Sequence, residues 1–150
     1  MAFDNTDPIQ LAALNSEVTE DPIGIGYSAV INNTRAVLEK LNDPAQNVGG
    51  ETINRPIEEL TISEVAGVID SVEYDALSAY DKEWVKMFIT RPLGENLTLY
   101  QTKFLALFGP ASDTRNAANA LRVKNASRAE ILFGVNTFIS RVDWVTARDF

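Results

Sequence analysis

The chain has 150 residues, 45% of them hydrophobic, and a formal net charge of −8. A chain of this length can bury a core without covalent staples, so a single domain is expected. It contains no cysteine and no histidine, which excludes disulfides, thiolate nucleophiles, sulfur-ligated metal sites and Ser-His-Asp catalysis. The negative charge would repel a phosphate backbone, which argues against nucleic acid as the main partner.

The charge is unevenly distributed along the chain. Residues 1–109 carry 17 acidic and 7 basic side chains, whereas residues 110–150 carry 4 acidic and 6 basic ones. A basic end on an acidic body would let copies associate head to tail, although an asymmetry of this size also arises by chance.

Neither a targeting segment nor a membrane span is expected. The opening residues Met1-Ala2-Phe3-Asp4 lack the apolar region of a signal peptide. No apolar run approaches the roughly 18 residues that span a bilayer. We therefore expect a protein made in the cytoplasm with no membrane partner.

The first predicted helix begins at a proline. Asp7 before Pro8 is typical of an N-cap followed by the first helical residue, and apolar residues then recur on one face as far as about Glu20. The next two residues, Asp21-Pro22, should end this helix.

The stretch "DPIGIGYSAV", residues 21–30, fits the spacing G-x-G-x-x-G/A of dinucleotide-binding loops through Gly24, Gly26 and Ala29. Such a loop follows a buried strand, whereas here a helix is expected before Gly24. We therefore interpret the glycines as a bend between helices, with Ser28 starting the next helix. At least one of the two glycines should have a positive φ.

The second predicted helix runs from Ser28 to Asn42, where Asp43-Pro44 should stop it. Residues 43–56, "DPAQNVGGETINRP", hold the densest cluster of turn-forming residues. We expect this segment to be the longest loop and a flexible one.

Capping patterns announce the later helices. A Ser or Thr followed three residues later by an acid allows each side chain to bind the other's backbone N–H. The pairs are Thr61/Glu64, Ser78/Asp81, Ser127/Glu130 and Ser140/Asp143. Together with the helical spacing they predict an all-α fold, a compact single domain of six to eight short helices with irregular connections.

Two consecutive helices are rich in bulky apolar residues. The first ends in "WVKMFI", residues 84–89, before a turn at Arg91-Pro92-Leu93-Gly94, and the second is apolar nearly all round until Gly109-Pro110. Such residues form either a central core or an interface with another subunit. The aromatic candidates for an interface are Trp84, Phe88, Tyr100, Phe104, Phe108 and Trp144.

Strand signals are weak. The runs "ETINRPI" and "GVNTFISR" alternate only slightly between apolar and polar residues, and neither is long enough to seed a sheet.

If the protein were an enzyme, the candidates for catalysis or metal binding would be pairs of acidic residues and several lysines. They are Glu58/Glu59, Glu73/Asp75, Asp81/Glu83, and the lysines 40, 82, 86 and 103. Acids at these spacings do not share a helix face and match no calcium-loop pattern, so a solvated acidic surface is the preferred interpretation. We expect no enzymatic activity, no cofactor and no metal.

The segment 111–134 carries Arg115, Arg122, Lys124 and Arg128. Without interleaved exposed aromatics this is a weak nucleic-acid signal. An intersubunit salt-bridge surface and a solvated face are equally compatible with it, and the arginines are candidate interface residues.

Six stretches carry a resemblance to a known group. They are "EVTEDPIGIGYSAV" and "VLEKLND" within residues 17–43, "ISEVAGVID" (62–70), "SAYDKEWVKMFI" (78–89), "TKFLALFG" (102–109) and "ASRAEILFGVNTFISRVDWVTAR" (126–148). With these stretches the chain resembles small proteins of tailed bacteriophages that are described as hypothetical or virion-associated. Members of this group have no agreed activity, so the resemblance transfers no catalytic residue.

The resemblance implies a bacteriophage setting: a virion structural or assembly protein, such as a head-tail connector, neck or tail-completion component. Its expected location is the virion, after synthesis in the bacterial host cytoplasm. Its expected partners are copies of itself, as a homo-oligomer, and the portal, neck, tail or capsid proteins. The alternative is a phage accessory protein outside the virion, either an assembly chaperone or an inhibitor of a host protein.

Overall fold

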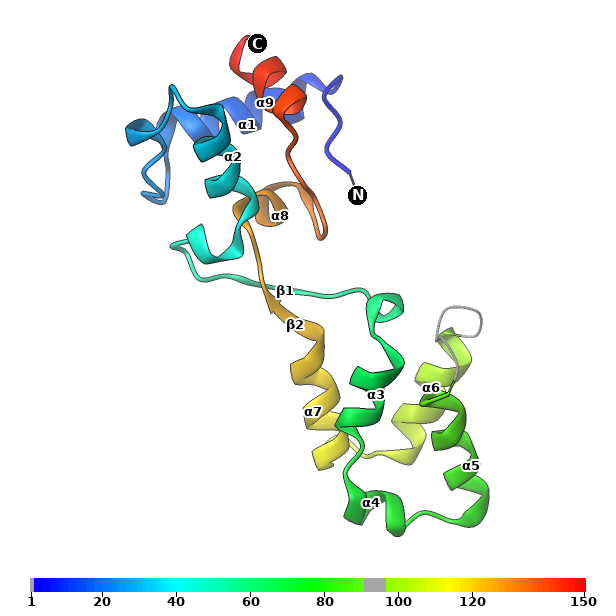
Figure 1. The fold of residues 1–150 in the computed structure, drawn as a ribbon. Helices are drawn as coiled ribbons and strands as arrows, with labels where there is room; N and C mark the ends of the chain where they lie inside the picture. Colours follow the sequence, from blue (N-terminus) through cyan, green and yellow to red (C-terminus); the bar gives the residue numbers. More distant parts are fainter. Residues whose placement is uncertain (1, 91–96) are drawn as a thin grey trace. The chain divides into compact units, whose positions relative to one another are not determined.

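The computed structural model describes residues 2–90 and 97–150, which are mostly helical (Figure 1). This part of the chain forms nine α-helices, three 3-10 helices (η1–η3) and two strands of three residues each. The all-α prediction is confirmed, with one α-helix more than the six to eight expected. The predicted turn at Arg91-Pro92-Leu93-Gly94 lies outside the described residues.

The chain divides into two compact units. The first comprises the described residues of Met1–Ile53 together with Asn125–Phe150, and the second is formed by Asn54–Lys124. The expectation of one domain concerns whether these units fold and unfold together, and it stays a prediction.

The first unit joins the two ends of the sequence around one core. Its elements are α1 (Pro8–Glu20), η1 (Tyr27–Ala29), α2 (Thr34–Asn42), η2 (Pro44–Gln46), α8 (Arg128–Phe133) and α9 (Arg141–Arg148). Helix α1 contacts α9, and α2 contacts α8 and α9. Leu14, Val37 and Trp144 from three of these helices are at most 1% exposed, and each bulky side chain buried in this way contributes about 1.5–3 kcal/mol.

Helix α1 starts and ends as predicted. The Asp7 side chain accepts a hydrogen bond from the N–H of Ile9, and Pro8 is the first helical residue. At the other end Asp21 adopts a left-handed conformation with φ of 47°. These two aspartates therefore define the helix as its local sequence indicates.

The predicted start of the second helix at Ser28 is wrong. Residues Tyr27–Ala29 form only a 3-10 turn, and α2 begins at Thr34. The reason is a competing cap, because the Asn33 side chain accepts a hydrogen bond from the N–H of Ala36. Its predicted end before Asp43-Pro44 is confirmed.

The glycine motif is a bend between helices, as predicted. Gly24 and Gly26 have φ of 74° and 86°, and helix α1 precedes them. The Asp21 carboxylate accepts hydrogen bonds from the N–H groups of Ile25 (2.6 Å) and Gly26 (2.7 Å). The loop thus uses two of the amides that would cradle a phosphate to bind its own aspartate.

The second unit contains the middle of the sequence. Its elements are η3 (Ile57–Glu59), α3 (Ile62–Val68), α4 (Ser71–Asp75), α5 (Ala79–Phe88), α6 (Leu97–Leu107) and α7 (Asp113–Arg122). Val65, Phe88 and Tyr100 form the buried centre, with partly buried apolar side chains packed around them. The pattern of capping boxes did not reveal α4, which is capped by the Asp70 side chain.

Three of the four predicted capping boxes form completely, at Thr61/Glu64, Ser127/Glu130 and Ser140/Asp143. At Ser78 only one half is present, in which the Ser78 side chain accepts from the N–H of Asp81. The Asp81 carboxylate lies 3.5 Å from the ammonium of Lys103 instead. This ion pair accounts for the missing half.

The two strands, β1 (Thr52–Asn54) and β2 (Val123–Asn125), pair with each other where the chain passes between the units. The flanking hydrogen bonds, Arg55 N–H to Arg122 C=O and Ala126 N–H to Glu51 C=O, show that the pairing is antiparallel. One weak strand signal, "ETINRPI", therefore does supply a short strand. The other, "GVNTFISR", forms none, because Gly134 and Asn136 adopt positive φ.

The expected flexible loop at residues 43–56 contains η2 and β1, and its flexibility stays a prediction. In the part of the chain that the structure describes, no helix has the length and apolar character to cross a membrane.

Candidate docking groove

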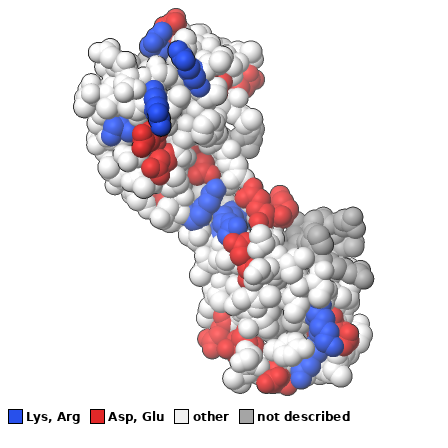
Figure 2. Space-filling view, in the orientation of Figure 1, with Lys and Arg blue, Asp and Glu red and all other residues white. Residues whose placement is uncertain are grey.

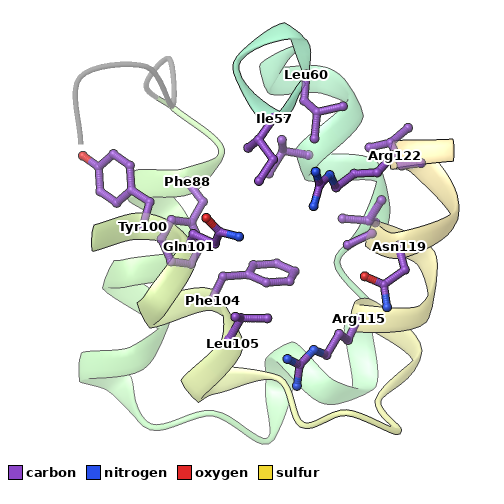
Figure 3. A pocket seen from close by; sticks show the side chains of 14 residues that line it. Ile57, Leu60, Phe88, Tyr100, Gln101, Phe104, Leu105, Arg115, Asn119 and Arg122 are labelled. Carbon is purple, nitrogen blue, oxygen red and sulfur yellow. The ribbon is translucent and has the colours of Figure 1, made fainter. Parts of the chain in front are cut away.

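A half-open apolar groove lies in the second unit, between α6 on one side and α7 with α3 on the other (Figure 3). Its cavity measures about 110 Å³. We call it the α6–α7 groove. It is lined by Ile57, Leu60, Val65, Val68, Phe88, Tyr100, Gln101, Phe104, Leu105, Arg115, Ala118, Asn119, Leu121 and Arg122.

Aromatic packing between α5 and α6 builds one wall of the groove. The rings of Phe88 and Tyr100 pack edge to face, with their centroids 5.7 Å apart. The rings of Phe88 and Phe104 are tilted relative to each other, with their centroids 6.0 Å apart. Phe88 and Tyr100 are buried, whereas Phe104 is partly exposed and Leu105 is 41% exposed. Aromatic pairs of this kind favour particular ring orientations, and α6 presents an apolar surface to the groove.

The opposite wall, α7, is anchored at its N-terminus. Thr114 is fully buried, and its hydroxyl oxygen accepts a hydrogen bond of 2.9 Å from the N–H of Asp70. The Glu73 carboxylate accepts hydrogen bonds from the N–H groups of Asp113 (2.7 Å) and Thr114 (2.9 Å). Hydrogen bonding by the Thr114 side chain and by these amides lowers the pKa of Glu73. Glu73 therefore stays ionised at the positive end of the helix, where a negative charge is stabilising.

Two arginines project from α7 into the groove. Arg115 and Arg122 are seven residues apart, and Figure 3 shows both guanidinium groups extending from α7 toward the space in front of α6. Neither makes an ion pair with any carboxylate of the described residues. The Nε of Arg122 is buried and has no hydrogen-bond acceptor among the residues that the structure describes.

Arg55 lies near this groove, and its guanidinium has a partner within the unit. Its guanidinium forms two hydrogen bonds with Glu64, of 3.0 and 3.2 Å. These bonds and the Thr61 N–H lower the pKa of Glu64 from 4.5 to about 2. Arg55 is thus paired within the unit, whereas Arg115 and Arg122 form no ion pair with any carboxylate that the structure describes.

The aromatic interface candidates lie mostly in the two cores. Phe88, Phe108 and Trp144 are at most 2% exposed and Tyr100 is 5% exposed. Trp84 and Phe104 are partly buried. Burial within their own units accounts for the apolar character of the first four, so the core interpretation fits them. Phe104 reaches a surface that a partner could contact.

Arg128 belongs to a different environment from Arg115 and Arg122. It is only 8% exposed, and its guanidinium binds the buried Glu17 at 2.7 and 3.0 Å within the first unit. The expectation that Arg128 lies on an exposed basic surface is therefore wrong. An arginine of this kind needs a buried counter-charge, and α1 provides it.

The basic end of the sequence is not one structural body. Arg115, Arg122 and Lys124 belong to the second unit, and Arg128, Arg141 and Arg148 to the first. On the face shown in Figure 2, acidic and basic side chains are interspersed among larger uncharged areas.

The acidic pairs do not converge. Glu58 and Glu59 are exposed, Glu73 caps α7, and Asp81 lies beside Lys103. Among residues 2–90 and 97–150 no group of three His, Cys, Asp or Glu side chains could hold a metal ion.

Sequence reasoning missed part of the groove. Gln101, Leu105 and Asn119 line it and are exposed, yet none was a candidate. The available signal was the i, i+7 spacing of Arg115 and Arg122, which places both on one face of a helix. Their apolar surroundings come from other helices and could not be read from α7 alone.

A groove with apolar walls and two guanidinium groups that no described carboxylate pairs can bind an apolar group that carries negative charge. None of the protein-family models matches the chain, and comparisons with curated proteins and with solved structures find no match either.

Proposed function

We propose that this chain is a structural or assembly protein of a bacteriophage particle that acts through protein–protein contacts, as a head-tail connector, neck or tail-completion component. The resemblance to virion-associated phage proteins supports the setting. The observation that carries the mode of action is the α6–α7 groove. Its partly exposed Phe104 and Leu105 line it together with two arginines that form no ion pair among the described residues.

The composition of the groove suits contact with another protein. Interfaces are enriched in aromatic residues and arginine, and their energetic centres combine an apolar pocket with a desolvated charge. The groove has both.

The proposal is tested in the phage that encodes the chain. Leu105→Glu places a charge in the groove at an exposed position, and we expect it to reduce the amount of the protein in purified particles, measured by mass spectrometry, and to reduce plaque formation. Leu99→Glu is the matched control, because Leu99 is 53% exposed on the same helix but does not line the groove. Circular dichroism of both purified variants checks that they fold.

Absence of the wild-type protein from particles and from their assembly intermediates would overturn the proposal, and would favour an accessory protein outside the virion. Light scattering after size-exclusion chromatography tests the proposed homo-oligomer separately.

A further inference from the structure

We propose that the α6–α7 groove binds a helical segment of a partner protein in which two acidic side chains, seven residues apart, flank one bulky apolar side chain. This deepens the proposed function, since it assigns the chemistry of the partner surface that the groove recognises. It rests on the proposed mode of action and not on the phage setting.

The size of the cavity selects an apolar side chain. About 110 Å³ is somewhat less than the roughly 150 Å³ of an apolar cavity that binds benzene. It is well below the roughly 300–1,000 Å³ of pockets that enclose whole small ligands. One Leu or Phe side chain therefore fills it, while the rest of the bound molecule lies along the open side.

The two arginines select negative charge and fix its spacing. Residues seven apart on a helix lie about 10 Å apart along its axis, so Arg115 and Arg122 mark two positions on one wall. A guanidinium binds a carboxylate through two parallel hydrogen bonds. A partner helix with acids at i and i+7 carries them on one face, at the same separation along its axis, with its apolar residues at i+3 and i+4 between them.

A ligand in the groove meets the terminal nitrogens of the Arg122 guanidinium, because the Nε of this side chain is buried. This donor lies in the interior without an acceptor among the described residues, which costs free energy in the unbound protein. A bound carboxylate satisfies the remaining donors of the same guanidinium, and Gln101 and Asn119 add exposed amides at the rim.

A fatty acid or another anionic amphiphile fits less well. It carries one carboxylate, which satisfies one arginine and leaves the other unpaired, and its chain exceeds the cavity volume. A helical protein segment meets both charges and needs room for only one side chain.

The test uses the purified full-length chain and a displayed library of helical peptides that is randomised at the two charge positions and at the apolar positions between them. We expect selection of Asp or Glu at both charge positions and of Leu, Phe or Met between them. For the best selected peptide, fluorescence anisotropy should show about 10-fold weaker binding to Arg115→Gln and to Arg122→Gln. Arg115→Lys and Arg122→Lys should recover part of the loss.

Arg141→Gln is the matched control, because it removes the same charge from an exposed position in the first unit and should leave binding unchanged. Selection at the two positions should also depend on separate arginines, so that Arg115→Gln abolishes the acidic preference at one position and Arg122→Gln at the other.

Four outcomes overturn the inference. They are enrichment of uncharged or basic peptides, no enrichment at all, equal binding of the peptide to all variants, and displacement of the peptide by dodecanoate at a concentration no higher than the peptide itself needs for binding. The last outcome would identify an anionic amphiphile as the ligand. A fifth outcome, formation of dimers that the peptide disrupts, would overturn the inference too, because it identifies a second copy as the occupant. Failure here with wild-type protein present in particles leaves the proposed function standing, and success with the protein absent from particles overturns the phage role alone.

Discussion

The Arg122 side chain has a buried Nε and extends into the α6–α7 groove. It should therefore affect both the stability of the fold and the binding of a partner. An unsatisfied buried donor costs about 1–3 kcal/mol. Met reaches as far as the position of the arginine Nε, carries no donor, and suits irregular apolar spaces.

We expect Arg122→Met to raise the free energy of unfolding by about 1 kcal/mol, measured by urea denaturation followed by circular dichroism. Arg115→Met is the control and should change stability by less than about 0.5 kcal/mol. If Arg122→Met instead lowered the free energy of unfolding by about 1 kcal/mol, the Nε of Arg122 would not be a costly unsatisfied donor.

Glu17 and Arg128 form a buried ion pair, and the Glu51 carboxylate lies 3.7 Å from the same guanidinium. Glu17 is 3% exposed and Arg128 8% exposed. Burial and the charge of Glu17 raise the pKa of the adjacent Tyr27, so that phenol stays neutral beside the pair.

We expect Glu17→Gln to lower the free energy of unfolding by about 3 kcal/mol, because it leaves the buried Arg128 guanidinium with only the more exposed Glu51 carboxylate, 3.7 Å away, as its counter-charge. The double variant Glu17→Met with Arg128→Met should lose less than Glu17→Gln, since both charges are removed. Glu20→Gln, at an exposed position on the same helix, serves as control. A Glu17→Gln protein as stable as this control would show that the pair contributes nothing.

At the scale of elements, helix ends are the features that local sequence predicts best. A capping side chain and the amide that it binds are two or three residues apart, so no distant partner decides the outcome. Asp7, Thr61, Ser127 and Ser140 all cap as their sequences indicate. Where prediction was wrong, at Ser28 and in the second half of the Ser78 cap, another side chain, Asn33 or Lys103, competed.

The N-terminus of α3 should respond to pH through Glu64. Its pKa lies at about 2 in the folded chain and at 4.5 without these contacts, so the folded state is favoured while the group is ionised. The stabilisation is therefore complete above about pH 5 and is lost as the pH falls toward 2. We expect the urea midpoint of the wild type to fall more between pH 6 and pH 3 than that of Glu64→Gln. Parallel curves for the two proteins would contradict this prediction. Glu58→Gln, at an exposed position, controls for general acid effects.

At the scale of the whole molecule, each unit has its own hydrophobic core. One core contains Leu14 and Trp144 and the other contains Val65 and Phe88, and none of the described residues belongs to both. The chain passes between the units at β1 and β2, which are three residues long each. Destabilisation of one core should therefore have little effect on the other.

We expect Leu14→Ala to cost about 3 kcal/mol, since this side chain is fully buried. Hydrogen exchange monitored by mass spectrometry should show faster exchange in α1, α2, α8 and α9 and unchanged exchange in α5 and α6. Phe88→Ala should give the reverse pattern. Faster exchange throughout the chain in either variant would contradict independent units and support the expectation of a single domain.

The helical class, most helix ends, the bend at Gly24 and Gly26, and the lack of cysteine and histidine chemistry can be read from the sequence, because they follow from composition or from contacts a few residues apart. Long-range packing was needed to learn that the two ends of the chain share a core, that Arg128 is buried against Glu17, and that Arg115 and Arg122 face an apolar groove. These outcomes depend on which distant segments pack together, and the spacing within one helix carries no information about the surface that the helix will meet.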